Sequence, residues 1–213
     1  MTIDRKTSAL IVVDVQNDFC PGGALAVKGG DAVVEPCNRA MRFFDHIVLT
    51  QDWHPLGHVS FASTWPGKRL YSQIEVAGEA QTLWPDHCVA GSAGADFHPR
   101  LDAPKASLVL RKGRSTSLDS YSAFLENDRR TSTGLAGYLR ELGVQDLYLA
   151  GLATDYCVLA SGLDAISSGF RLCLIADAVR GVDLPAGSAI AAIEKLKTLG
   201  AAIIAVEDLG ALP

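Results

Sequence analysis

Short runs of apolar residues recur along the chain, and they are continuous rather than alternating with polar residues. Continuous runs are typical of strands buried on both faces, as in a parallel sheet covered by helices. Alternating runs would instead indicate a sheet with one face in water. We therefore predict six mostly parallel strands, at residues 8–14, 46–52, 107–112, 146–151, 170–177 and 201–207.

Most of the intervening segments have helical patterns with recognisable ends. Pro36 lies near the start of the first segment, where a helix needs no backbone donor. Ser132 is expected to cap the second segment, and the second, third and fourth segments each end in glycine, a common residue just beyond a helix. The predicted helices are 33–45, 132–143, 155–169 and 186–200.

Strand–helix alternation of this kind predicts a three-layer α/β/α domain with a doubly wound, mostly parallel six-stranded sheet. A length of 213 residues fits one domain, and we expect residues 1–213 to form it. Residues 52–105 interrupt the rhythm and are rich in Pro, Gly, His and Trp. A long irregular region in a compact domain is usually functional, so we expect it to carry part of a site.

The composition narrows the classes of function. The chain is 48% hydrophobic and 20% charged, which excludes a disordered chain, and its net charge of -5 provides no basic surface for nucleic acid or membrane lipid. The apolar run at 9–13 is too short for a signal peptide or a membrane span. We expect a cytoplasmic protein that acts on a small molecule, and no sequence feature marks or excludes a homo-oligomer.

Five cysteines occur, without a C-x-x-C pair, so free thiols are expected. Cys157 lies in the first turn of the helix predicted at 155–169, and it could be a core residue, a redox thiol or a nucleophile. A helix N-terminus stabilises a thiolate, which predicts a lowered pKa, and its backbone N–H groups can bind an oxyanion.

A nucleophilic cysteine needs a proton acceptor, and no histidine lies near Cys157 in the sequence. Asp14, Asp52 and Lys112 each end a predicted strand. Parallel strands carry their ligand sites beyond their carboxyl ends, so these groups and the loop before Cys157 are expected to meet. A Cys/His pair formed through space stays open as an alternative.

Residues 52–105 also contain a candidate metal site. Asp52 and His54 are two residues apart at a strand end, where their side chains can point the same way. Either His58 or His87 could complete a set of two histidines and one carboxylate. Such a set suits one divalent ion (zinc, iron or manganese) and leaves positions open for water or substrate.

Five segments, in order, make the chain similar to a known family. They are VVDVQNDFCPGGALAV, TQDWHPLGHVSFAS, WPDHCVAGSAGADFHP, RKGRSTSLDSYSAF and GLATDYCVLASGLDA. Over residues 8–182 the chain resembles the nicotinamidases, which belong to the isochorismatase-like cysteine hydrolases. The resemblance implies an isochorismatase-like fold and a catalytic triad of Asp14, Lys112 and Cys157.

The resemblance also implies how substrate is bound. It places a divalent metal on Asp52, His54 and His87, with His58 as a fourth ligand in some members. We expect the metal to be zinc rather than iron or manganese. It implies a cis peptide bond between Leu152 and Ala153, with the N–H groups of Ala153 and Cys157 as the oxyanion hole. The aromatic side chains that it assigns to the pyridine pocket are Phe19, Trp84 and Tyr121.

The implied reaction is hydrolysis of nicotinamide to nicotinate and ammonia through a thioester, with pyrazinamide as a second substrate. The alternatives are an amidase of the same family for a carbamoyl or ureido substrate, and a non-catalytic nicotinamide-binding protein. A flavodoxin-like nucleotide binder ranks last, because no G-x-G-x-x-G sequence follows the first predicted strand.

Overall fold

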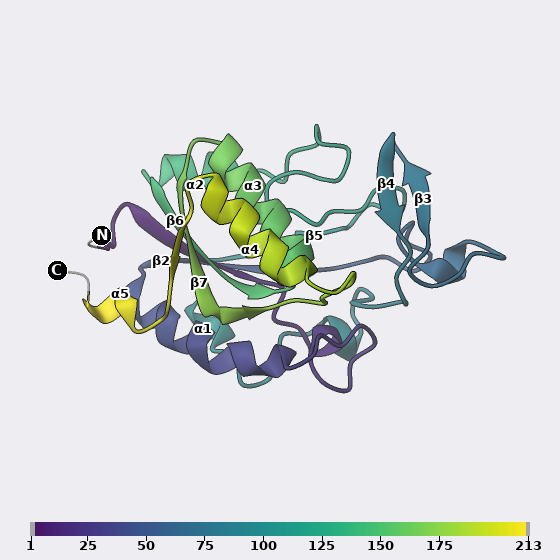
Figure 1. Cartoon of the computed structure of the whole chain (residues 1–213), viewed down its shortest axis with the longest axis horizontal. Coiled ribbons are helices and arrows are strands. Elements are labelled where there is room, and N and C mark those ends of the chain that lie inside the picture. Colours follow the sequence, from purple (N-terminus) through teal and green to yellow (C-terminus); the bar gives the residue numbers. More distant parts are fainter. Residues whose placement is uncertain (1–2, 212–213) are drawn as a thin grey trace.

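The computed structural model describes residues 3–211 and is built around one six-stranded sheet (Figure 1). All five pairs of neighbouring strands are parallel, and the strand order is β5-β2-β1-β6-β7-β8. The six strands are β1 (Ser8–Val13), β2 (His46–Asp52), β5 (Leu108–Lys112), β6 (Asp146–Leu152), β7 (Arg171–Arg180) and β8 (Ala202–Ile204). From the centre of the sheet, β1, β2 and β5 follow one another toward one edge, and β6, β7 and β8 follow one another toward the other. The direction of the strand order therefore reverses between β1 and β6.

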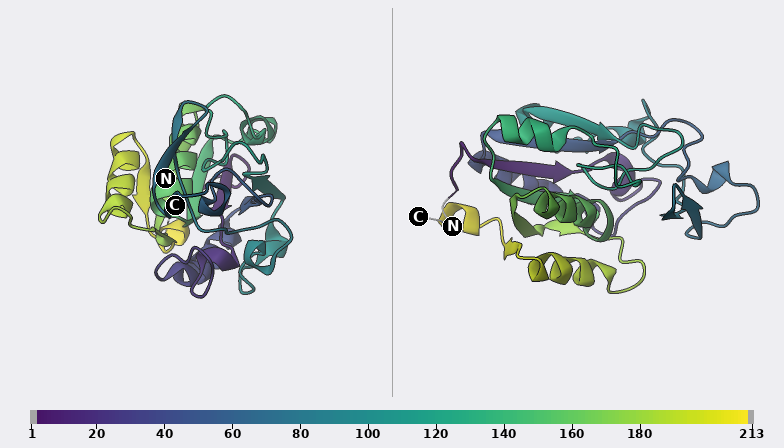
Figure 2. Two further views of the ribbon diagram at one scale, coloured as in Figure 1. Left: turned by 90° about the vertical axis from the view of Figure 1, so that its right-hand side faces the viewer. Right: turned by 90° about the horizontal axis from the view of Figure 1, so that it is seen from above.

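Helices cover both faces of the sheet (Figure 2). Helices α1 (Val34–Ala40) and α5 (Asp208–Ala211) contribute buried side chains to the core on one face. Helices α2 (Leu135–Glu141), α3 (Leu159–Ser167) and α4 (Ser188–Thr198) contribute to the core on the other. This arrangement confirms the predicted three-layer, doubly wound α/β/α fold.

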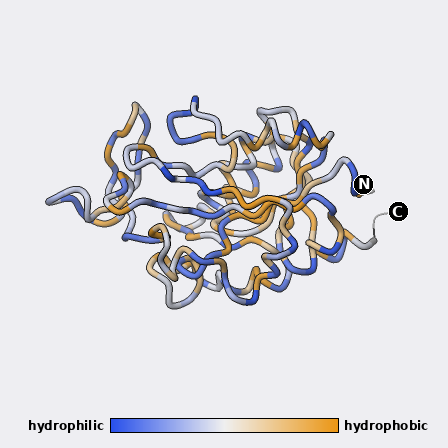
Figure 3. Tube along the Cα trace, turned by 180° about the vertical axis from the view of Figure 1, so that it is seen from behind, coloured by the Kyte–Doolittle hydropathy of each residue, from blue (hydrophilic) through white to orange (hydrophobic). Residues whose placement is uncertain are grey.

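The two cores follow from the pleat of the strands. Successive side chains of a strand point to opposite faces. In β1, Leu10 and Val12 accordingly pack into one core, whereas Ile11 and Val13 pack into the other, and all four are at most 1% exposed. The apolar colouring in Figure 3 is concentrated in this central sheet.

The strand predictions were right to within one residue at every end except two. The strand predicted at 201–207 stops at Ile204, because the N–H of Ala205 bonds to Asp208 Oδ2 and that of Val206 to Asp177 Oδ1 instead of continuing a ladder. β7 continues three residues past the predicted end, because Val179 and Arg180 pair with the end of β6 beyond an irregularity in the register.

Three helix predictions needed correction at their starts or interiors. The predicted cap Ser132 is wrong: it stays extended in a bridge to Leu125, and α2 begins at Leu135 after Gly134. The segment predicted as one helix at 33–45 is α1 flanked by 3-10 turns, Gly30–Val33 and Met41–Phe43. The segment at 155–169 starts as a π-helical turn, Thr154–Val158, before α3.

Residues 52–105 are irregular as predicted, except for a hairpin that the hydrophobic pattern did not reveal. Its strands, β3 (Gln73–Val76) and β4 (Glu79–Thr82), project from the main body (Figure 1). Ala77 and Gly78 join them, both with positive φ, as a tight two-residue hairpin turn requires. Most of the hairpin residues are exposed, so no apolar run marked them. No helix within residues 3–211 has the length and apolar character to cross a membrane.

Candidate active site

The candidate site lies at the carboxyl edge of the sheet, where the strand order reverses. Asp14 follows β1, Asp52 ends β2, Lys112 ends β5, and the turn containing Cys157 follows β6. These four strands are neighbours in the sheet, so residues far apart in the sequence meet at one edge. In open α/β sheets the crevice at this reversal is the usual ligand site.

Lys112 is the centre of this cluster. Its Nζ lies 2.8 Å from Asp14 Oδ2, 2.5 Å from Asp52 Oδ1 and 3.4 Å from Cys157 Sγ, and it donates to the Ser120 carbonyl at 3.0 Å. Its side chain is fully buried. Although burial disfavours the ammonium, Asp14 and Asp52 hold the pKa of Lys112 well above its usual value. The lysine is therefore a fixed positive charge between two carboxylates and a thiol.

Asp14 combines burial with one unused acceptor. Its Oδ1 accepts a hydrogen bond from Thr50 Oγ1 at 2.6 Å. Its Oδ2 forms an ion pair with Lys112 Nζ at 2.8 Å, but among residues 3–211 no donor reaches it with the geometry of a hydrogen bond. Burial raises the pKa of Asp14 to about 6, although Lys112 opposes the shift. A carboxylate with a pKa near neutrality and an open oxygen is suited to accept a proton.

Cys157 differs from the sequence expectation in its ionisation. Burial raises the pKa of its thiol well above the usual range, although Lys112 opposes that shift. The expected lowering at a helix N-terminus is therefore wrong for this structure: desolvation of a buried thiolate outweighs the favourable charges. The resting group is a neutral thiol, which needs a base before it can act as a nucleophile.

The turn between β6 and α3 brings Cys157 to this edge. Gly151 has φ of 109°, and a Cβ there would lie 2.1 Å from the Val13 carbonyl oxygen, so only glycine allows β1 to pass this closely. The Leu152–Ala153 peptide bond is cis, as the resemblance implied. Ala153 and Cys157 line the same pocket, and each is 6% exposed.

Asp52, His54 and His87 form a buried group whose candidate ligand atoms all lie within 4.8 Å of one another. His54 Nδ1 lies 3.0 Å from the Gly113 carbonyl, and His87 Nδ1 lies 2.8 Å from the Pro85 carbonyl. A carbonyl can only accept, so each Nδ1 carries the proton and each Nε2 keeps its lone pair. His87 is thus held in the form that binds metal. Burial opposes protonation of His54, but Asp52, whose Oδ2 lies 3.6 Å from His54 Nε2, raises its pKa, so His54 would give up a proton when it binds a metal.

The charges of this group also suit a cation. Burial alone would raise the pKa of Asp52, but Lys112 and His54 hold it well below its usual value. Burial, reinforced by His54, lowers the pKa of His87 to about 4. Asp52 is therefore anionic and His87 neutral at physiological pH, as metal ligands must be. These residues fit a divalent ion.

His58 is oriented differently. Its Nδ1 accepts the Ser60 backbone N–H at 3.3 Å, and its Nε2 lies 3.3 Å from the Leu118 carbonyl. Its Nε2 therefore carries the proton and has no lone pair for a metal. His58 stacks on His54, with ring centroids 4.2 Å apart, in a second buried group with His54 and Asp119. The residue pattern left His58 and His87 as alternatives, the resemblance implied His87, and the geometry groups His87, not His58, with Asp52.

The predicted aromatic residues line the same pocket as Cys157. Phe19, Trp84 and Tyr121 all face it, and Trp84 Nε1 donates to the Tyr121 hydroxyl at 3.0 Å. The cavity is narrow, since the centre of a water molecule can occupy only about 30 Å³ of it. A flat aromatic ring fits such a space better than a branched or bulky group.

Four further lining residues escaped the sequence analysis: Leu25, Asp119, Tyr156 and Val182. Tyr156 was detectable, because it lies directly before Cys157 in a quoted segment. Leu25 and Asp119 also lie in segments that carry the resemblance, whereas Val182 lies in a loop without a pattern, and only folding brings it to the pocket.

Comparison with known proteins agrees with this geometry. The isochorismatase domain model matches residues 8–208. The chain is 51% identical over 176 residues to a nicotinamidase of Acinetobacter baylyi, covering 83% of this chain and 82% of that protein. It is 42% identical over 204 residues to the nicotinamidase of Escherichia coli, covering 94% and 95% of the two chains.

Solved structures extend the likeness to the fold. A nicotinamidase/pyrazinamidase of Acinetobacter baumanii superposes with a TM-score of 0.94 at 46% identity, covering 97% of this chain and 100% of that one. PnC1 of L. infantum in complex with nicotinate has a TM-score of 0.84 at 38% identity, covering 97% and 96%. A Pyrococcus horikoshii pyrazinamidase in complex with zinc has a TM-score of 0.77 at 36% identity, covering 93% and 99%. The chain belongs to the nicotinamidases of the isochorismatase family.

Proposed function

We propose that this protein hydrolyses the carboxamide of nicotinamide to nicotinate and ammonia, with Cys157 as the nucleophile. The observation that carries the proposal is the contact of Lys112 Nζ with both Asp14 (2.8 Å) and Cys157 Sγ (3.4 Å) inside a narrow aromatic pocket. The nicotinate complex of the L. infantum relative supports the substrate class. Pyrazinamide, whose ring has similar size and shape, is proposed as a second substrate.

The reaction begins with proton transfer from the Cys157 thiol to the open Oδ2 of Asp14. Lys112 remains an ammonium and stabilises the thiolate that forms. The thiolate attacks the amide carbon, and the backbone N–H groups of Ala153 and Cys157 are proposed to bind the resulting oxyanion. Asp14 returns the proton to the leaving nitrogen, which departs as ammonia and leaves a thioester. Water then hydrolyses the thioester, which releases nicotinate and restores the thiol.

The remaining candidate residues hold the ring. Phe19, Trp84 and Tyr121 are proposed to contact its faces and edges, where stacked or edge-on aromatic contacts are favourable. Asp52, His54 and His87 would hold one divalent ion, proposed as zinc, with iron or manganese as the alternatives. When bound, that ion supplies a Lewis acid for the ring nitrogen. His58 is proposed to orient the His54 ring rather than to bind the ion.

The decisive experiment measures ammonia release from nicotinamide by the metal-loaded wild-type protein beside Cys157→Ala. We expect release by the wild type and none by the variant, with equal metal content in both. Release only from carbamoyl or ureido compounds would favour the alternative amidase. Binding of nicotinamide without any ammonia release would favour a non-catalytic binding protein.

We also infer a single domain over residues 1–213 and a cytoplasmic location. The sheet supports one domain, because it combines strands from near both ends of the chain, β1 and β8. All five cysteines are buried free thiols, which supports a reducing compartment. Limited proteolysis and localisation of a tagged protein test the two inferences.

A further inference from the structure

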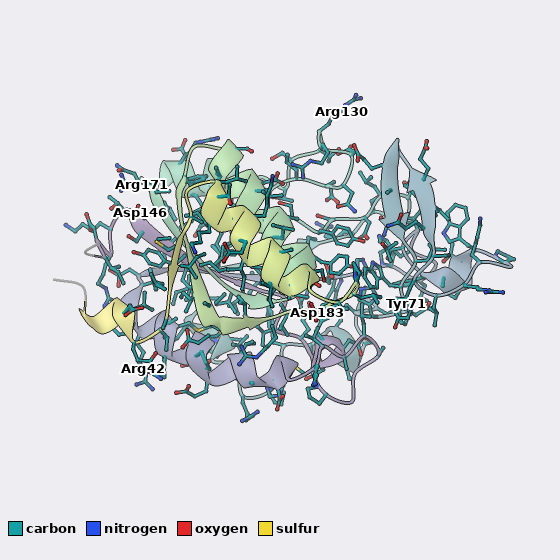
Figure 4. The ribbon with its side chains drawn as sticks, viewed as in Figure 1. Arg42, Tyr71, Arg130, Asp146, Arg171 and Asp183 are labelled. Carbon is teal, nitrogen blue, oxygen red and sulfur yellow. The ribbon has the colours of Figure 1, made fainter. Side chains whose placement is uncertain are left out.

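The segment from the end of β7 to the first residue of α4, residues 181–188, forms one wall of the pocket, and we call it the covering loop. Its Val182 lines the pocket beside Cys157. Residues 183–187 are exposed to solvent (Asp183 is labelled in Figure 4). An exposed loop with few apolar contacts is among the less stable parts of a protein, so the bonds that hold it in place decide the shape of this wall.

Asp155 supplies most of those bonds. It lies in the π-helical turn, two residues before Cys157. The proposed catalytic mechanism gives it no role. Its Oδ1 accepts the Val182 N–H at 2.9 Å, and its Oδ2 accepts the Asp183 N–H at 2.8 Å and the Ser188 hydroxyl at 2.5 Å. A carboxylate offers two oxygens and several lone pairs, so one side chain accepts all three donors.

Tyr156, the next residue, holds the same loop at a fourth point. Its hydroxyl donates to the Leu184 carbonyl at 2.9 Å. Its ring lines the pocket and makes edge contacts with Trp84 (centroids 4.8 Å apart) and Tyr121 (5.7 Å). The turn that carries Cys157 is thus hydrogen-bonded to the covering loop and in aromatic contact with Trp84 and Tyr121.

The backbone of Gly181 approaches Asp155 so closely that a side chain at this position would not fit. A Cβ on Gly181 would lie 3.0 Å from Asp155 Oδ1 and 2.5 Å from Ala189 Cβ. Outside the loop runs a separate open groove, lined by Tyr71, Thr82, Leu184 and Pro185 together with the outer side of Tyr156. The covering loop therefore divides the narrow pocket from an open groove.

We propose that Asp155 is a positioning residue for specificity: it fixes the covering loop at a set distance from Cys157 and so limits the size of the ring that the pocket accepts. This inference rests on the proposed function, since it concerns the same pocket. It assigns Asp155 no contact with substrate. The residue acts through Val182 and Tyr156, which it holds in register with the nucleophile.

The test variant is Asp155→Asn, which keeps the shape of the side chain but replaces one acceptor oxygen by a donor that faces other donors. We expect KM for nicotinamide to rise about tenfold, with kcat changed less than about threefold. Discrimination against ring-methylated nicotinamides should fall, because the wall is no longer held. Alkylation of Cys157 by iodoacetamide, followed by mass spectrometry of its peptide, should accelerate.

Asp183→Asn is the matched control. Asp183 Oδ1 also accepts two backbone N–H groups, from Gly187 and Ala189, but both lie within the loop and the start of α4. We expect this variant to keep the wild-type KM, ring selectivity and alkylation rate. If both variants lose ring selectivity equally, the effect belongs to loop stability in general and the inference about Asp155 is wrong.

Two further arms keep the inference testable. If Asp155→Asn does not fold, Ser188→Ala removes one of the three bonds and should give a smaller change of the same kind. A lowered melting temperature with unchanged KM, selectivity and alkylation would overturn the inference and leave Asp155 a structural residue. Alkylation needs no turnover, so it reports on the loop even if the wild type releases no ammonia and the proposed function fails.

Discussion

The body of the sheet and its carboxyl edge are equally buried, but the body consists of apolar side chains and the edge of charged ones. In the body, Leu10, Ile11 and Leu149 are 0% exposed and touch other apolar side chains. At the carboxyl edge of the same sheet, Asp14 and Lys112 are at most 1% exposed and carry charge. Burial stabilises the apolar body by about 25 cal/mol for each Å² removed from water, whereas it costs free energy for each charge. The free energy gained by burying the apolar body therefore offsets the cost of burying the charged groups at the edge.

The comparison also shows why the edge is tolerable. Each charged group there has a partner of opposite sign at short distance, and Lys112 serves two carboxylates at once. Buried pairs of this kind contribute little net stability, yet removal of one partner leaves an uncompensated charge. Single substitutions should therefore separate the two regions: changes in the body should affect folding, and changes at the edge should affect chemistry.

The largest effect is expected for Lys112→Met, which keeps the length of the side chain but removes the charge. We expect kcat/KM to fall about 10⁴-fold, because the thiolate loses its counter-charge, and the free energy of unfolding at neutral pH to fall by about 3–5 kcal/mol. Without the ammonium, the folded-state pKa of Asp14, which burial already raises to about 6, rises further, and that of Asp52 rises from its lowered value. The folded state then binds more protons, so part of the stability should return as the pH is lowered.

The control for that variant is Lys105→Met. Lys105 is 42% exposed and pairs with Asp102 on the surface, so its loss should change neither activity nor stability by a measurable amount. Urea unfolding followed at several pH values measures both variants. Equal destabilisation at pH 5 and pH 7 in Lys112→Met would contradict the account of two unpaired carboxylates.

In the body, Leu149→Ala should lower the free energy of unfolding by about 2–5 kcal/mol through lost burial and a residual cavity. Activity for each folded molecule should stay within about twofold of the wild type, since Leu149 lies in the apolar core on the face of α2 and α3. Denaturant unfolding and active-site titration measure the two quantities. A specific loss of kcat in the folded fraction would mean that the body and the edge are not separable.

At the edge, His87→Ala and His58→Ala test which of the two histidine rings binds the metal. We expect His87→Ala to weaken metal binding about 100-fold or more, with a parallel rise in KM, because a ligand is lost. His58→Ala should weaken it by no more than about tenfold, through the ring of His54 that it stacks on. Metal titration by calorimetry decides, and the reverse ranking would return His58 to the ligand set.

The smallest effect is a pH dependence of the unmodified protein. Asp14 must be ionised to accept the thiol proton, and burial raises its pKa to about 6. The value of kcat/KM should therefore rise with pH through about 6 and fall about tenfold for each pH unit below it. An acid limb near 4, the ordinary value for aspartate, would show that the base is not a desolvated carboxyl.

Much of this site could be predicted from local patterns. Continuous apolar runs identified the strands, and Asp14, Asp52 and Lys112 were recognisable because each follows directly on such a run. The hairpin β3–β4 was missed because its residues are mostly exposed and form no continuous apolar run, so hydrophobicity has no reason to mark them. The thiol pKa was expected in the wrong direction, because burial of Cys157 depends on neighbours from other parts of the chain.

By itself the sequence determined the parallel α/β fold, the order of its strands along the chain, and which chemical groups stand at their ends. Those properties depend on residues within one segment, where hydrophobicity and turn residues act locally. The residue pattern left His58 and His87 open; the tertiary structure groups His87 with Asp52, as the family resemblance implied, and shows that Asp155 holds the loop containing Val182. These choices depend on carbonyl and N–H partners from distant segments, such as those of Leu118 and Val182, and folding alone brings such partners within hydrogen-bonding distance.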